Sequence, residues 1–358
     1  MKTIKKLLAL TLVLCMVFCL SSAVFAVSKD KDDNFVDEEK ITITKIYNLA
    51  NAGQGISPAD TFYLTQVGDA VISQSDATSA PDLPTITVNG ETTKYVGQAT
   101  FAAGAAGNTT NDAYKTTFTV NLPEATLFTN VGEYKYKLKE VQGTTAGVTY
   151  YDKEFYLVIT VINDSATGKL RIAQVHTEDP ISSTTSEKKD SITNTYSAGS
   201  LSIKKNVTGN LGDKNKFFKF TVTLTAEDGK TGTPTSFTVP EAKRGSYAEN
   251  GGNPSSIPLG TATTFYLKHD ETFEIDNIPY GVSYTVTEEQ ATDYEAPSYD
   301  NKQNGTINAA STETVVTNNR GGTIDMGVTL DSLPYILALA VVFGGAVVMF
   351  TRKRHVED

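Results

Sequence analysis

Residues 41–49 read ITITKIYNL, an apolar–polar alternation whose regular part, ITITK, ends at Lys45. A period of two is the pattern of a half-buried β-strand, because successive side chains of a strand point to opposite faces of the sheet. Similar runs, rich in Thr, Val, Tyr and Phe, recur between clusters of Gly, Asn, Asp and Pro: KTTFTVNL (115–122), EYKYKLKEV (133–141), EFYLVITVI (154–162), FFKFTVTLTA (217–226) and VSYTVTEE (282–289). Outside the two ends, no stretch of the sequence has a sustained helical period. The sequence therefore predicts an all-β protein.

The strand pattern occurs in two halves that follow one plan. In each half an alternating strand ends in Lys, an aromatic-rich strand ends in Glu, and a last strand ends in Asn. These residues are Lys45, Glu140 and Asn194 in the first half, and Lys205, Glu288 and Asn318 in the second. Because a whole plan is repeated, we expect two tandem β-sandwich domains, 41–197 and 200–320, that meet at the small-residue stretch 197–200.

This trio of residue types can form a covalent cross-link. Burial in an apolar core disfavours the charged forms of both a Lys amine and a Glu carboxyl. The neutral amine can then attack the Asn carboxamide, while the protonated Glu polarises the carbonyl and passes protons to the departing ammonia. Lys, Glu and Asn are also common as solvated residues at strand ends, so one trio alone does not separate these interpretations. A second trio in the same order favours the cross-link.

Both ends of the chain carry segments typical of exported proteins. Residues 1–26 have a basic start, an apolar run and a cleavage-site pattern, VFA, which together predict a signal peptide. Residues 27–40 form an acidic lead segment. Residues 333–351 are apolar over close to the about 20 residues that a bilayer span needs. Because basic residues follow this run, we expect a transmembrane helix with 352–358 as a cytoplasmic tail, joined to the second domain by 321–332.

The positions of the cysteines favour a covalent cross-link other than a disulfide. Cys15 and Cys19 are the two cysteines of the chain, and both lie in the predicted signal peptide. Exported proteins commonly use disulfides, but the mature chain would have no cysteine with which to form one. Lys–Asn bonds would supply the missing covalent link.

Composition and motifs argue against several functions. The formal net charge is −10, which disfavours nucleic-acid binding. The spacing of the histidines does not suggest a zinc site, and the sequence has neither a recognisable nucleophile motif nor a phosphate-binding glycine loop. The stretch DNKQNG (300–305) resembles a calcium loop, but Lys302 occupies a ligand position. We expect no cofactor, no metal and no enzymatic turnover, only one autocatalytic event in each domain.

The ordered set of motifs resembles that of Gram-positive shaft (backbone) pilins of the streptococcal type. The motifs are ITITKIYNL, VGEYKYKLKEV, GVTYYDKEFYLVITV and SITN in the first half, and LSIKKNVTG, NIPYGVSYTVTEE and TVVTNN in the second. The resemblance implies immunoglobulin-like, Cna-B-like domains that form internal isopeptide bonds. It pairs Lys45 with Asn194 under catalysis by Glu140, and Lys205 with Asn318 under catalysis by Glu288.

In the second half, adjacent residues of the same types could also form the bond. Lys204 and Asn319 stand beside Lys205 and Asn318 in the sequence. Alternation within each strand favours Lys205 and Asn318 as the inward-facing residues.

The resemblance also implies covalent polymerisation. Pilins of this type are cut by a sortase at a short signal, and the new carboxyl end is joined to a Lys of the next subunit. In this chain the signal would be TIDMGV (323–328), cut between Met326 and Gly327, with Met326 at a position where the family has Thr. The acceptor would be Lys188 or Lys189, although the same residues can be interpreted as an exposed basic pair in a loop.

The implied partners are other copies of the chain, a pilus-class sortase, minor pilins and cell-wall peptidoglycan, at the cell surface. If the sortase rejects Met326, the chain would stay a membrane-anchored monomer. The alternative function is therefore a wall- or membrane-anchored adhesin or minor pilin that does not polymerise.

Overall fold

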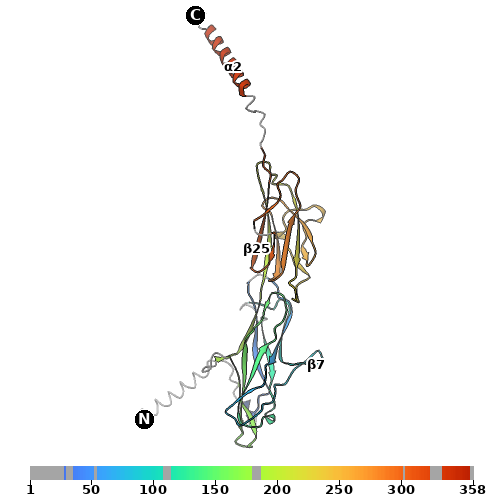
Figure 1. Cartoon of the computed structure of the whole chain (residues 1–358), viewed down its shortest axis with the longest axis vertical. Coiled ribbons are helices and arrows are strands. Elements are labelled where there is room, and N and C mark those ends of the chain that lie inside the picture. The colour runs from blue at the N-terminus through green and yellow to red at the C-terminus, as the bar shows by residue number, and fades with distance from the viewer. Residues whose placement is uncertain are drawn as a thin grey trace, which may run out of the picture.

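The computed structural model describes residues 28–29, 35–51, 55–107, 114–179, 187–300, 303–322 and 333–354. The predicted signal peptide and the sorting-like residues Met326 and Gly327 lie outside this set. Two elongated β-domains follow one another along the long axis, as Figure 1 shows. The predicted mostly-β character is thus confirmed. We refer to residues 41–197 as domain 1 and to residues 198–320 as domain 2.

Domain 1 is built from two facing sheets that hold its core between them. In the described residues, one sheet has the strand order β14-β13-β12-β10-β4-β8, with β5 also paired to β10, and the other has the order β11-β15-β3-β9. The elements are β3 (Lys40–Leu49), β4 (Asp60–Gln66), β5 (Val71–Ser73), β6 (Thr87–Val88), β7 (Glu91–Thr92), β8 (Tyr95–Phe101), β9 (Lys115–Asn121), η2 (Ala125–Leu127), β10 (Gly132–Glu140), β11 (Val148–Thr149), β12 (Glu154–Asn163), β13 (Leu170–Asp179), β14 (Glu187–Lys188) and β15 (Ser191–Tyr196), preceded by the paired β1 (Ser28–Lys29) and β2 (Phe35–Val36).

Domain 2 repeats the arrangement with fewer strands. Its described sheets have the orders β21-β16-β25-β23 and β20-β17-β22-β24. The elements are β16 (Ala198–Thr208), β17 (Phe218–Thr225), β18 (Ser236–Thr238), η3 (Glu241–Lys243), η4 (Glu249–Gly251), β19 (Ser256–Pro258), β20 (Thr263–Leu267), β21 (Thr272–Pro279), β22 (Ser283–Glu288), β23 (Ser298–Tyr299), β24 (Asn304–Thr306) and β25 (Ser311–Asn319).

The alternation seen in the sequence sets which side chains enter each core. In β3 the residues Ile41, Ile43, Lys45 and Tyr47 are buried, and their neighbours face the other side of the sheet. The two hydrophobic cores are separate, and their described buried members lie within residues 41–316. A fragment of residues 27–322 therefore contains each of these core residues.

The first and last strands of each domain lie side by side and run parallel. β3 pairs with β15, and β16 pairs with β25. Parallel neighbours require a long connection, and here the connection is the rest of the domain. This topology brings residues at the two ends of each domain sequence into contact.

The junction between the domains is a continuous strand path rather than a flexible linker. Ser197 alone separates β15 from β16, and the predicted small-residue boundary is mostly buried strand. The backbone N–H of Tyr280 donates to the carbonyl of Ser197 at 3.0 Å, and that of Thr231 donates to the carbonyl of Thr144 at 2.8 Å. The side-chain amide of Asn51 donates to the Tyr280 hydroxyl at 2.8 Å. These hydrogen bonds join the two domains in addition to the strand path itself.

The apolar run at the C-terminal end forms α2 (Leu333–Arg354). Its side chains, such as Tyr335 and Phe343, are exposed, and it lies apart from both domains in Figure 1. Within the described ranges, no helix combines the length and apolar character needed to cross a membrane. The predicted helix is present, and its membrane crossing stays a prediction.

The close approach at Gly199 should make this position intolerant of a side chain. A Cβ at Gly199 would lie 2.1 Å from the carbonyl oxygen of Ala309, a backbone atom that cannot move aside easily. We expect Gly199→Ala to lower the free energy of unfolding of domain 2 by about 1–3 kcal/mol. Urea unfolding of the fragment 27–322 measures this. Gly321→Ala, where the nearest other atom is 3.9 Å away, is the control; equal midpoints for both variants would contradict the expectation.

Candidate functional site

The three side chains of the first trio meet inside domain 1. Lys45 lies on β3 and Asn194 on β15, neighbouring strands of one sheet, and Glu140 ends β10 in the facing sheet. Ile192 is opposite Lys45 in the parallel register, so Asn194 is two residues further along and points to the same face. All three side chains are buried, with Lys45 and Asn194 fully so.

Glu140 bridges the amine and the carboxamide. The Lys45 amine donates to Oε2 of Glu140, and the Asn194 amide nitrogen donates to Oε1 at 2.5 Å. The Asn194 carbonyl oxygen accepts a bond from the backbone N–H of Tyr151 at 2.8 Å. One carboxyl group thus contacts both the nitrogen that would attack and the nitrogen that would leave.

The surroundings of the first trio are dry and aromatic. The Lys45 amine lies 4.7 Å from the ring centroid of Phe62 and 5.7 Å from that of Phe118. Burial lowers the pKa of Lys45 to about 8, although Glu140 acts in the opposite direction. Burial also raises the pKa of Glu140 above its ordinary value, against the effects of Lys45 and Asn194. Both shifts favour the neutral amine and the protonated carboxyl, the forms that the reaction needs.

Domain 2 brings the second trio together in the same topology. Lys205 lies on β16, Asn318 on the parallel neighbour β25, and Glu288 at the end of β22 in the facing sheet. The Lys205 amine donates to the Asn318 carbonyl oxygen and to the backbone oxygen of Val316 at 3.2 Å. It lies 3.1 Å from Oε2 of Glu288 and 4.3 Å from the ring centroid of Phe218.

The charge states in domain 2 are shifted in the same directions. Burial lowers the pKa of Lys205 to about 8, opposed by Glu288. Burial raises the pKa of Glu288, opposed by Lys205. Both domains therefore favour the neutral amine and the protonated carboxyl, but the Asn318 amide nitrogen makes no hydrogen bond to Glu288.

The two sites differ in how the Asn carbonyl is held. In domain 1 it faces the backbone N–H of Tyr151, whereas in domain 2 it faces the attacking amine itself. An N–H donor aimed at a carbonyl stabilises the negative charge that develops on oxygen during acyl transfer. Tyr151 was not predicted from the sequence, because a backbone donor in a loop leaves no residue-type signal.

Lys204 and Asn319, which adjoin the trio residues Lys205 and Asn318 in the sequence, contact residues outside the trio. Lys204 has a side chain that is 41% exposed and lies 3.9 Å from Asp270. Asn319 donates from its amide nitrogen to Glu295 at 2.8 Å. The structure therefore places Lys205 and Asn318, rather than these neighbours, beside Glu288.

The residues expected for assembly are not part of either buried trio. Lys188 is exposed. Lys189 is less accessible, because its amine is 3.2 Å from Asp179 and 4.9 Å from the ring centroid of Tyr151. Among the residues that the structure describes, no group of His, Cys, Asp and Glu could hold a metal ion.

Comparison with known proteins gives matches along most of the chain. A family model described as a Spy0128-like isopeptide containing domain matches residues 43–197. A model described as a domain of unknown function matches residues 199–320. A pilin of Streptococcus pyogenes serotype M1 is 25% identical over 360 residues, which is 92% of this chain and 95% of that protein.

Two further matches are more limited. The pilus tip adhesin Cpa of Streptococcus pyogenes is 38% identical over 95 residues, 26% of this chain and 12% of that protein. The crystal structure of the major pilin from Streptococcus pyogenes aligns with a TM-score of 0.49 at 21% identity, covering 80% of this chain and 100% of that chain.

Removing the carboxyl partner of Lys45 should make domain 1 sensitive to acid. In Glu140→Ala the amine stays buried, and its pKa should fall below the value of about 8 that it has beside Glu140. A group with a depressed pKa contributes stability above its unfolded value, near 10.5, and this contribution is lost as the pH falls through the folded value. The loss is about 1.4 kcal/mol for each unit of depression.

We therefore expect Glu140→Ala to melt at a higher temperature at pH 9 than at pH 6. Thermal unfolding followed by circular dichroism measures the difference. The double variant Lys45→Met with Glu140→Ala, which has no buried amine in this trio, is the control and should lose this dependence. A Glu140→Ala variant that responded to pH as the control does would contradict the argument.

Proposed function

We propose, from the confirmed resemblance of this chain to Gram-positive shaft pilins with isopeptide-forming domains, that it is the repeating subunit of a cell-surface fibre. Each domain would be locked by an internal isopeptide bond, Lys45 to Asn194 and Lys205 to Asn318. The observation that carries the proposal is a buried trio in both domains, with Lys and Asn on the first and last strands and Glu on the facing sheet.

The contacts in domain 1 suggest the path of the protons. The neutral Lys45 amine attacks the side-chain carbonyl carbon of Asn194, and the developing oxyanion is stabilised by the backbone N–H of Tyr151. Glu140 takes a proton from the attacking nitrogen through one oxygen and gives one to the leaving nitrogen through the other. The carbon–nitrogen bond of the carboxamide breaks, ammonia leaves, and Glu140 returns to its protonated form.

Proximity supplies much of the rate in this proposal. Neighbouring parallel strands hold the amine and the carboxamide on one face, so the reaction is intramolecular and needs no cofactor. The same arrangement limits each domain to a single event, because the product occupies the site. The chain is therefore proposed to mature itself and not to turn over a substrate.

The second part of the proposal is covalent polymerisation of the chain. A pilus-class sortase would cut between Met326 and Gly327 and join the new carboxyl end to a Lys of another copy. The exposure of Lys188 favours it over the ion-paired Lys189 as acceptor. The signal peptide would direct export, the apolar segment 333–351 would hold the precursor at the membrane, and the fibre, together with minor pilins, would be joined to peptidoglycan.

A second function is favoured by one observation. The match to the pilus tip adhesin Cpa suggests a wall- or membrane-anchored adhesin or minor pilin that uses the same domains without polymerising. The departure from the family pattern at Met326 is consistent with this alternative. Both functions share the internal bonds and differ only in the assembly step.

Intact-mass measurement tests the internal bonds. We expect the fragment 27–322 to be lighter than its sequence by two ammonia molecules, about 17 Da each. Glu140→Ala and Glu288→Ala should each restore one of them, and the double variant both. Lys204→Ala is the matched control and should keep both losses. A fragment with the full sequence mass would overturn the proposed cross-links.

Immunoblots of cell-wall extracts test the assembly step. A shaft subunit should give a ladder of high-mass species that survives boiling in detergent. Lys188→Ala should abolish the ladder, because it removes the acceptor amine, whereas Lys189→Ala should preserve it. A single band from the unaltered chain would favour the adhesin, and a ladder that persisted in Lys188→Ala would reject that acceptor.

A further inference from the structure

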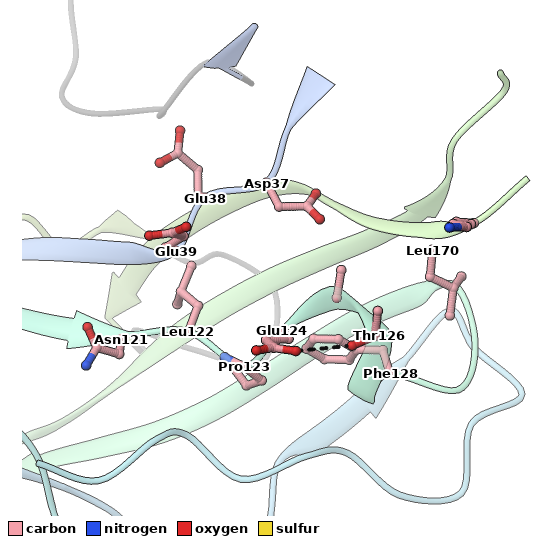
Figure 2. Close-up of a pocket in the computed structure, with 12 residues that line it drawn as sticks. Asp37, Glu38, Glu39, Asn121, Leu122, Pro123, Glu124, Thr126, Phe128 and Leu170 are labelled. Atoms are coloured by element: carbon pink, nitrogen blue, oxygen red, sulfur yellow. Dashed lines mark hydrogen bonds between the residues drawn. The ribbon is translucent and has the colours of Figure 1, made fainter. Parts of the chain in front are cut away.

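The end of domain 1 that faces away from domain 2 has an open cleft with an acidic wall. The cleft has a volume of about 920 Å3. Among the described lining residues, the acids are Asp37, Glu38, Glu39 and Glu124 and the lysine is Lys169. Asp37 already accepts a hydrogen bond from the Ile172 backbone N–H at 2.9 Å. Figure 2 shows the first three carboxylates on one side and Glu124 on the other.

The lining of this cleft is partly apolar. Leu122 and Phe128 are buried beneath it and Leu170 is half-buried. Figure 2 shows the Phe128 ring next to Glu124. The cleft thus combines negative charge with an apolar surface.

Large apolar side chains are exposed near the same end. Leu127 is 57% exposed, Val131 38% and Ile162 36%. Leu127 adjoins the cleft residues in sequence, Val131 immediately precedes β10, and Ile162 lies near the end of β12 at the same pole. Single exposed apolar residues are ordinary, but several around one cleft are typical of a contact surface.

The opposite end of the two-domain body carries a complementary loop. Residues 209–216, GNLGDKNK, connect β16 to β17. Leu211 is 42% exposed, and Lys214 and Lys216 are exposed beside the single acid Asp213. The loop is held next to the C-terminal end of domain 2, because the Leu211 N–H donates to the Arg320 carbonyl at 3.1 Å.

We propose that the acidic cleft of domain 1 binds the 209–216 loop of a second copy of this chain, non-covalently and head to tail. Leu211 would contact the apolar lining, and Lys214 and Lys216 would face the carboxylates. The cleft lies beside the start of β3 and the loop follows the end of β16, so the two surfaces are at opposite ends of the two-domain body. This body is elongated (Figure 1), and one molecule cannot bring its own two surfaces together. A contact between different surfaces that does not close into a ring generates a filament.

This docking goes beyond the proposed function, because it requires neither the sortase nor the internal bonds. It would align subunits in the order in which they are to be joined. One loop in one cleft buries less surface than a stable complex requires, so the isolated contact is weak and depends on charge. It therefore weakens as salt screens the pairs.

Sedimentation velocity of the fragment 27–322 tests the docking without any covalent joining, since the sorting-like residues are absent. We expect association that rises with concentration at low salt and disappears at high salt. Glu38→Lys with Glu124→Lys should weaken it about tenfold, as should Lys214→Glu with Lys216→Glu. The matched control, Lys153→Glu with Glu91→Lys, changes exposed charges away from both surfaces and should associate normally.

Mixing the two impaired variants distinguishes the proposed contact from a symmetric one. Each variant keeps one intact surface, so the mixture should form one-to-one heterodimers that neither variant forms alone, whereas the unaltered fragment should extend into longer oligomers. A contact between identical ends would not be restored by mixing, and that result would overturn the proposal. So would association that none of the variants changes.

Cysteine cross-linking gives a second measurement, since the fragment has no cysteine of its own. Thr126→Cys places a thiol at the cleft and Leu211→Cys places one in the loop. On mild oxidation of a mixture, we expect heterodimers in excess of the statistical proportion. A statistical mixture of the three dimers would overturn the proposal. Failure here leaves the mass and ladder tests of the proposed function unaffected.

Discussion

Each domain must accommodate a buried amine on its first strand, beside its last strand. Lys45 and Lys205 lie in hydrophobic cores, where an unpaired ammonium would cost several kcal/mol. A glutamate from the facing sheet offsets part of this cost, and the lowered pKa of each lysine shows that burial still outweighs the pairing. Such a pair stabilises the fold weakly on its own. Conversion of the amine into an amide removes the charge and the cost together.

The parallel pairing of terminal strands explains why the trio is spread so widely over the sequence. For the Lys–Asn bond to form here, the amine and the carboxamide lie on the same face of one sheet. They are therefore on neighbouring strands, displaced along the strand by an even number of residues. The carboxyl group contacts both of them from the facing sheet. Any protein that meets these conditions with its first and last strands separates the three residues by nearly a whole domain, as both domains do here.

Period-two alternation was sufficient to predict the long strands that carry the trios and the inward positions of the trio residues. It also separated Lys205 from Lys204 and Asn318 from Asn319, because a shift of one residue turns a side chain to the opposite face. The Tyr151 N–H could not be predicted, since backbone donors depend on loop geometry. The stretch 197–200 was predicted as a boundary from its small residues. At Gly199, a small residue is required because the backbone of Ala309 lies very close.

The strand path through Ser197 connects the two sites mechanically. β15 carries Asn194 and continues after one residue into β16, which carries Lys205. With both bonds formed, a load that enters domain 1 at the proposed acceptor Lys188 would reach β15 along the chain, pass through Ser197 to Lys205, and cross to β25 at Asn318. Every step of that path is covalent, so the hydrogen bonds of the parallel strands would bear little of the tension. The junction bonds around Tyr280 then have a different role, which is to resist bending between the domains.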